Sequence, residues 1–304
     1  MRALAVTGCV AAILLLTNAW SNSNNLLPQV ATVDDLEIDV EEINPWTNLE
    51  INNRVENFQF AIVTDRTGGA RAGIFESAVP KINLLQPEFV ISVGDLIEGS
   101  TEDPQVFNMQ WMEFEGLVKQ LQMPFFYVPG NHDISNVPMQ SEWNRRFGRS
   151  WYSFKFHDVL FICLNTEDEK SEEKRDYYFS QEQRDWLKET LAENTDVRWT
   201  CVFLHKPAWT YDGSKFEELG WTDVEESLQG RGYTVFSGHR HTYKRFERHG
   251  MEYYMLATTG GGSDLRGKDA GEFDHVVWVT IKEKGPVLAN LMLDGIESKE
   301  IGLK

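Results

Sequence analysis

Short apolar runs in this chain end directly in residues that can bind a metal ion or a phosphate group. The run at 125–128 is stopped by Pro-Gly and followed at once by Asn131, His132 and Asp133. Such runs are typical of buried strands, and Pro-Gly breaks regular structure. In open α/β sheets, ligands bind just beyond the carboxyl ends of the strands. The run therefore predicts a strand that brings three polar groups to an active-site edge.

The same arrangement recurs elsewhere in the chain. Apolar runs at 60–64, 89–93, 201–204 and 234–237 lead respectively into Asp65, Gly94-Asp95, His205 and Gly238-His239-Arg240-His241. Apolar residues keep helical spacing at 74–85, between the runs at 60–64 and 89–93, and at 104–122, between the runs at 89–93 and 125–128. Strands that alternate with helices predict right-handed crossovers and a parallel core, so the fold class is α/β.

The second half of the chain adds a hairpin and two helix-start signals. Residues 152–156 and 159–164 read as paired strands. The capping-box signals are Ser180 with Gln183 and Thr222 with Glu225. With no internal repeat and no second boundary, residues 58–304 are expected to form one domain.

The first 21 residues resemble a secretory signal peptide. Arg2 gives a positive start, residues 3–16 are apolar, and Ala19 and Ser21 are small residues near the expected cleavage point. An uncleaved anchor is the alternative, although the run is short for a bilayer span. We expect a secreted or periplasmic protein with no membrane span once the leader is removed. Residues 22–57 form an acidic segment to which we assign no chemistry.

The charge of the chain restricts its partners. Its 47 acidic and 29 basic residues give a formal net charge of −18. A surface this acidic argues against nucleic-acid binding by counterion release. It does not exclude a small phosphate ester, because bound metal ions can dominate the local field. Cys163 and Cys201 lie in apolar runs and are expected to be buried, with no disulfide framework.

The polar groups at the strand ends resemble the motif set of one known family. The matching residues are Asp65, Gly94-Asp95-x-x-Glu98, Gly130-Asn131-His132-Asp133, His205 and Gly238-His239-x-His241. In this order, each after a strand, they resemble the calcineurin-like metallophosphoesterases. The resemblance covers most of the chain beyond residue 58. It implies a layered β-sandwich flanked by helices and a metal-dependent hydrolase of phosphate mono- or diesters.

The resemblance also implies a role for each matching residue. Two divalent or trivalent ions (Mn, Fe or Zn) would form a dinuclear centre with a metal-bound hydroxide as nucleophile. Asp95 would bridge the ions, with Asn131, His205 and His239 completing one site and Asp65 and His241 belonging to the other. His132 would act as general acid, and Asp133 would fix its orientation.

One position departs from the family pattern. Most members carry Asp-x-His after the first strand, whereas this chain has Asp65-Arg66-Thr67. Purple acid phosphatases also lack that histidine and use a tyrosine three residues past the bridging aspartate. Glu98 holds that position here and is a candidate metal ligand. The alternative is that Glu98 caps a helix or pairs with Arg66.

Two further residues are candidates for substrate binding. The planar guanidinium of Arg66 could hold a phosphate oxygen, with a surface charge as the alternative. Trp209 follows His205 closely and could line a pocket, with core packing as the alternative.

The leading hypothesis is an exported monomeric phosphoesterase that acts on a small phosphate ester. A catalytically degenerate binding protein on the same fold is a second hypothesis, motivated by Thr67. A structural cell-surface protein is a third, supported only by the acidic segment at 22–57.

Overall fold

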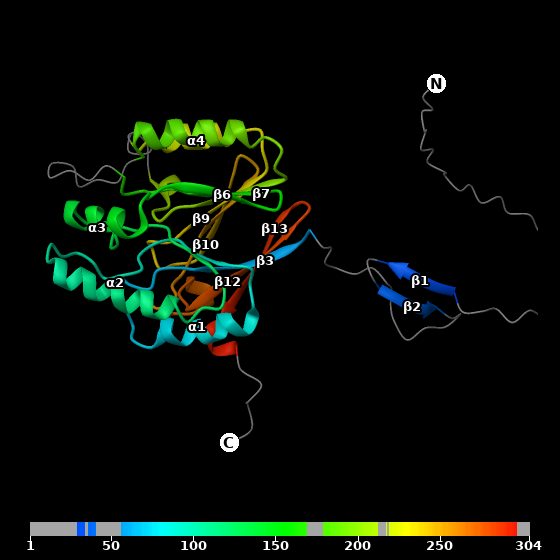
Figure 1. The fold of residues 1–304 in the computed structure, drawn as a ribbon, viewed down its shortest axis with the longest axis horizontal. Helices are drawn as coiled ribbons and strands as arrows, with labels where there is room; N and C mark the ends of the chain where they lie inside the picture. Colours follow the sequence, from blue (N-terminus) through cyan, green and yellow to red (C-terminus); the bar gives the residue numbers. More distant parts are fainter. Residues whose placement is uncertain are drawn as a thin grey trace, which may run out of the picture. The chain divides into compact units, whose positions relative to one another are not determined.

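The computed structural model describes residues 29–33, 36–40, 56–168, 179–211, 217 and 219–296 (Figure 1). The chain divides into two units, Met1–Arg54 and Val55–Lys304. In the first unit, β1 (Gln29–Val33) and β2 (Leu36–Val40) pair antiparallel. The expected leader lies outside the described residues, so its removal stays a prediction.

The second unit contains a five-stranded and a six-stranded sheet. In spatial order the five strands are β13 (Gly285–Met292), β12 (His275–Lys282), β3 (Phe58–Val63), β4 (Val90–Ser92) and β5 (Phe125–Phe126). The six strands are β10 (Lys244–Arg248), β11 (Met251–Met255), β9 (Tyr233–Ser237), β8 (Trp199–Phe203), β7 (Val159–Cys163) and β6 (Tyr152–Phe156). Strands β3, β4 and β5 run parallel, as do β7, β8 and β9.

Helices cover the outer face of each sheet. On the five-stranded side lie α1 (Ile74–Leu85), α2 (Pro104–Val118) and α3 (Val137–Phe147). On the six-stranded side lie α4 (Gln181–Glu193) and α6 (Trp221–Ser227). The short 3-10 helices are η1 (Ala208–Thr210), η2 (Lys268–Ala270) and η3 (Leu293–Gly295). Figure 1 shows α1 and α2 on one side of the sheets and α4 on the other. The expected α/β sandwich flanked by helices is confirmed.

Aromatic side chains fill the space between the two sheets. Phe161 of β7 is fully buried, with its ring centroid 5.3 Å from Phe60 of β3 and 5.2 Å from Phe89. Phe203 of β8 lies 5.1 Å from Phe236 of β9. Each buried ring contributes roughly 1.5–3 kcal/mol by leaving water. This apolar contact fixes the relative placement of the two sheets, and with it that of their polar edges.

The helix-start signals had different outcomes. The Ser180 hydroxyl accepts a hydrogen bond from the Gln183 backbone N–H at 3.1 Å, so this N-cap is confirmed. The cap predicted at Thr222 is wrong, because α6 begins at Trp221 with Gly220 as its N-cap, which places Thr222 inside the helix. The Glu225 carboxylate pairs instead with the Arg248 guanidinium at 2.6 Å. A strong tertiary partner therefore outweighed the local capping pattern.

Within the described parts of the chain, no helix combines the length and apolar character needed to cross a bilayer.

Replacing Phe161 with alanine should remove the ring at the centre of the sandwich. Because Phe161 is fully buried, we expect the free energy of unfolding to fall by about 3–5 kcal/mol. Urea unfolding followed by circular dichroism measures this change. The control is Val287→Ala on β13, where the side chain is 57% exposed and the expected change is within about 0.5 kcal/mol. Equal losses in the two variants would contradict the assigned core.

Candidate metal centre

Loops at one edge of each sheet carry the predicted metal ligands. Asp65 follows β3, Asp95 follows β4, Asn131 follows β5, His205 follows β8, and His239 and His241 follow β9. Because these strands are parallel within each sheet, their carboxyl ends meet at a shared edge. The packing of the two sheets then brings both edges together.

The ligand atoms gather in two overlapping clusters. Asp95, His205 and His239 form one cluster, and Asp65, Asp95 and His241 form the other. Within each cluster the ligand atoms lie within 4.8 Å of one another. Asp95 belongs to both, which is the placement that a bridging ligand requires. The metal-ligand roles themselves stay predictions.

Asn131 lies beside the first cluster. Its side-chain oxygen is 3.1 Å from Nε2 of His205, and the same nitrogen is 3.1 Å from Oδ2 of Asp95. The structure therefore brings together every predicted ligand except Glu98, which is described below.

The ring orientation of two histidines fits a cation between them and the carboxylates. His205 Nδ1 lies 2.9 Å from the Val93 carbonyl, and His241 Nδ1 lies 2.5 Å from the Gly262 carbonyl. Since a carbonyl oxygen only accepts, each Nδ1 must carry the donated proton. Nε2 of His241 then faces Oδ1 of Asp65 at 3.4 Å. A bare lone pair facing that carboxylate would be unfavourable, so the arrangement suits a proton on Nε2 or a cation held by both groups.

The pKa values show how strongly the carboxylates act on the imidazoles. Burial opposes protonation of His205, but the charges of Asp95 and Asp65 outweigh it and raise the pKa of His205 to about 9. For His241, burial again lowers the pKa, and its hydrogen bond with Asp65 raises it overall. Burial and the neighbouring His205 lower the pKa of His239 to about 3, so this ring is neutral and ready to act as a ligand.

The glycines in the motifs have a steric role that the motif search missed. A Cβ at Gly238 would overlap Oδ2 of Asp65, and a Cβ at Gly130 would overlap Oδ1 of Asp95. These positions let the backbone approach the carboxylates closely. Accordingly, the His239 N–H donates to Asp65 Oδ1 at 2.8 Å. In the sequence, Gly130 directly precedes Asn131 and Gly238 directly precedes His239, so a glycine before a predicted ligand is the pattern that could have revealed this role.

Backbone strain is concentrated at the ligands. Asp95, His239 and His241 have φ angles of 56°, 75° and 51°, in the left-handed region that side chains rarely adopt. Such residues cost on the order of 1–3 kcal/mol each and persist only where surrounding contacts hold them. The fold therefore maintains this ligand arrangement at the expense of stability.

The structure corrects the role predicted for Asp133. His132 Nδ1 donates to the Glu98 backbone carbonyl at 2.6 Å, so that carbonyl orients the ring. The Asp133 carboxylate is fully buried and accepts from the backbone N–H groups of Gly130, Leu96 and Ile97. Burial and the Asp95 charge raise the pKa of Asp133 to about 7. Asp133 thus ties the loops after β4 and β5 together.

Arg66 does not face the metal centre, which corrects its predicted role in substrate binding. Its guanidinium is nearly buried and donates to Glu113 of α2 at 2.5 Å and to the Leu96 carbonyl at 3.2 Å. It also lies 5.8 Å from the centre of the Phe75 ring and 5.7 Å from that of Phe114. These contacts direct the side chain under α1 and α2.

Trp209 is a core residue, which corrects its predicted role as a pocket wall. Only 5% of it is exposed, and its ring centroid lies 5.1 Å from Tyr253 and 5.9 Å from Trp221. The packing alternative holds here because η1 turns the chain back onto the six-stranded sheet immediately after His205.

Glu98 lies beside the clusters but belongs to neither. One carboxylate oxygen, Oε1, accepts from the backbone N–H groups of Gly69 and Ala70 at 3.1 and 2.6 Å. The Thr67 hydroxyl, at the position of the missing histidine, donates to the Ile97 carbonyl at 2.9 Å. The Thr67 hydroxyl and Oε1 of Glu98 thus bond to backbone groups, and Glu98 does not pair with Arg66. The metal-ligand role of Glu98 stays a prediction.

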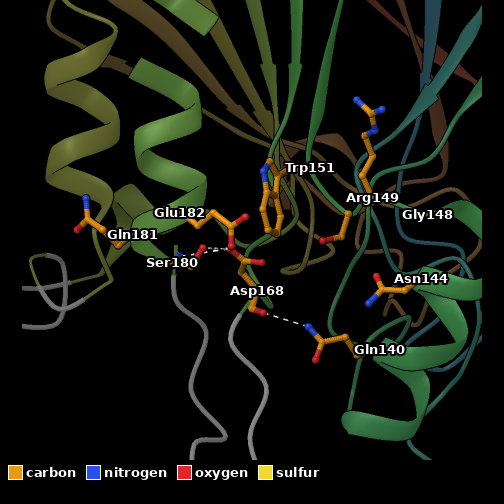
Figure 2. Close-up of a pocket in the computed structure, with 10 residues that line it drawn as sticks. Gln140, Asn144, Gly148, Arg149, Trp151, Asp168, Ser180, Gln181 and Glu182 are labelled. Carbon is orange, nitrogen blue, oxygen red and sulfur yellow. Dashed lines mark hydrogen bonds between the residues drawn. The ribbon is translucent and has the colours of Figure 1, made fainter. Parts of the chain in front are cut away.

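A separate hollow of about 470 Å³ lies between α3, the start of α4 and the loop before β6 (Figure 2). Gln140 on its wall donates to the Asp168 carbonyl at 3.0 Å, and Ser180 bonds to the Asp168 carboxylate. None of the predicted site residues lines this hollow. Both of these bonds converge on Asp168.

Comparison with known proteins agrees with this arrangement. The model of the family described as calcineurin-like phosphoesterase matches residues 59–243. Serine/threonine-protein phosphatase CPPED1 of Mus musculus is 29% identical over 222 residues, which cover 66% of this chain and 68% of the mouse protein. Probable purple acid phosphatase 20 of Arabidopsis thaliana is 23% identical over 201 residues, covering 57% of this chain and 45% of the plant protein.

A solved structure shares the fold. A dimetal phosphatase from Danio rerio superposes with a TM-score of 0.62 at 15% identity, covering 78% of this chain and 96% of that chain. The family match begins in β3, ends two residues after His241 and includes every predicted ligand. This chain therefore belongs to the calcineurin-like phosphoesterase family.

Proposed function

We propose that this protein hydrolyses phosphate mono- or diesters at a dinuclear centre held by the clustered carboxylates, imidazoles and amide. The observation that carries the proposal is the sharing of Asp95 between two ligand clusters. The phosphatase names of the matched relatives support the same reaction class.

The chemistry of the donors agrees with this function. Bound ions at the two clusters would neutralise charge on the phosphoryl group and activate water. Asp65 and Asp95 are 0% and 2% exposed, so water cannot screen their attraction for a cation effectively. Imidazole with carboxylate suits Mn, Fe or Zn, and the donors do not choose among them.

His132 is the proposed general acid. Its side chain is 23% exposed, so the ring reaches the surface where a leaving group would depart. Nδ1 is occupied by the Glu98 carbonyl, which leaves Nε2 to hold and deliver a proton. The His132 N–H also donates to Asp95 Oδ1 at 2.9 Å, which ties the acid to the shared ligand.

A binding protein without turnover is the second candidate. It is favoured by Thr67, whose hydroxyl turns to the Ile97 carbonyl and leaves the second cluster with three protein ligands. Three protein ligands with open positions also suit a catalytic metal. A pure binding protein has no need of His132, so an activity assay separates the two candidates.

Ligand and acid variants should fail in different ways. We expect Asn131→Ala and His239→Ala to lose both metal and activity, because His239 belongs to the first cluster and Asn131 is the amide ligand proposed beside it. His132→Ala should keep its metal and lose turnover by roughly 10²–10⁴-fold. Elemental analysis and hydrolysis of 4-nitrophenyl phosphate and bis(4-nitrophenyl) phosphate measure both properties. His249→Ala, at a half-exposed histidine in a hairpin turn, is the control.

Full activity in all three variants would show that the active site is assigned wrongly. Chelation that leaves the wild type active would exclude metal dependence.

Replacing Arg66 with methionine should affect stability and leave substrate affinity unchanged. The guanidinium bonds to Glu113 and Leu96, so its loss should lower the free energy of unfolding by about 1–3 kcal/mol. KM and the urea midpoint give the two measurements, with Arg245→Met, 58% exposed on β10, as the control. A raised KM with unchanged stability would return Arg66 to the substrate site.

We further propose that the protein is exported and its leader removed. Arg2, the apolar run at 3–16 and Ala19 support this. Amino-terminal sequencing of protein from the native host should begin near Trp20 or Asn22. Recovery of intact Met1 from the cytoplasm would overturn the proposal.

A further inference from the structure

Two loops interlock beside the candidate metal centre. They are the loop between β3 and α1 and the loop between β4 and α2. The backbone N–H groups of Arg66 and Thr67 donate to the Asp95 carbonyl at 3.0 and 3.2 Å. The Thr67 hydroxyl donates to the Ile97 carbonyl at 2.9 Å. These bonds join residues 66 and 67 of the first loop to residues 95 and 97 of the second.

The Glu98 carboxylate binds the next part of the first loop, residues 69 and 70. Its Oε1 accepts from Gly69 N–H at 3.1 Å and from Ala70 N–H at 2.6 Å. Bonds from N–H groups to an ionised oxygen are stronger than those between neutral groups. Without this carboxylate, the two N–H groups would have only water to bond.

The segment that Glu98 holds lies against two site histidines. A Cβ at Gly68 would lie 3.0 Å from Cε1 of His241 and 3.5 Å from Nε2 of His132. The Gly68 carbonyl accepts from Gly262 N–H at 3.3 Å, and the Gly262 carbonyl accepts from His241 Nδ1 at 2.5 Å. A displacement of this segment would therefore move the partner that orients His241.

The backbone of Glu98 acts on the other histidine directly. Its carbonyl accepts from His132 Nδ1 at 2.6 Å. The next two residues, Gly99 and Ser100, have φ angles of 55° and 52°, and Gly99 packs closely on the His132 carbonyl. This tight turn holds the Glu98 carbonyl where His132 needs it, and the side-chain bonds anchor the turn from the opposite side.

We infer that Glu98 is a positioning residue that orients His132 and His241 by anchoring the loop after β3, and that it is not a metal ligand. The inference rests on the proposed function, in which His132 is the general acid. It also accounts for Thr67, since the loop that would carry the missing histidine is here fixed by contacts with its neighbour.

Amide exchange tests the anchoring without any catalysis. Hydrogen exchange at Gly69 and Ala70 should be at least about tenfold faster in Glu98→Ala than in wild type, because the two N–H groups lose their acceptor. Glu98→Gln should restore part of the protection, because its amide oxygen can still accept. Glu102→Ala removes an exposed acid from the same loop and should change nothing. Each variant should keep the metal content of wild type.

Leaving-group dependence tests the effect on His132. A poorly placed acid slows esters of poor leaving groups most, because these need a proton as the bond breaks. We expect kcat of Glu98→Ala to fall about 10–100-fold for a phenyl ester and less for the 4-nitrophenyl ester, with KM nearly constant. Glu98→Gln should recover part of this loss.

Three results would overturn the inference: unchanged amide exchange in Glu98→Ala, equal losses of kcat for the two esters, or loss of one metal ion in both Glu98 variants. The last result would make Glu98 a ligand. If wild type with metal restored hydrolysed neither ester, the proposed function would fail. The exchange rates would then decide alone whether Glu98 anchors the loop.

Discussion

The arrangement of the polar edge depends on two aspartate carboxylates that are buried there. Asp65 and Asp95 are almost inaccessible to water, and a buried carboxylate without partners is strongly unfavourable. Backbone N–H groups, imidazoles and glycine clearances are all arranged around them. The remaining negative charge is best balanced by cations, so the polar edge makes physical sense as a metal centre.

The strands, and the polar side chains that gather beyond their ends, could be predicted because both depend on short, regular patterns. An apolar run that ends in Asp65 or His205 fixes a strand and the edge at which it stops. No regular sequence pattern indicates the direction in which a loop side chain points. The partners of Arg66 and Glu98 could not be predicted, because they come from other elements of the fold. Arg66 bonds to Glu113, and Glu98 bonds to the backbone N–H groups of Gly69 and Ala70.

The errors at Asp133 and Trp209 have a common physical cause. Asp133 directly follows His132 and Trp209 lies four residues after His205, so closeness in the sequence was taken as shared function. The backbone turns sharply at both places, because Asp133 bonds three N–H groups and η1 folds Trp209 onto the sheet. The glycines were overlooked for the opposite reason, since their contribution is the absence of a side chain.

The ligand set is divided between the two sheets. Asp65, Asp95 and Asn131 belong to the five-stranded sheet, and the three histidines belong to the six-stranded one. An ion held by both groups would act as a cross-link between the layers, and its binding energy would add to the cohesion of the folded state. The centre is complete only when the two sheets have packed together, because neither sheet alone carries the whole ligand set.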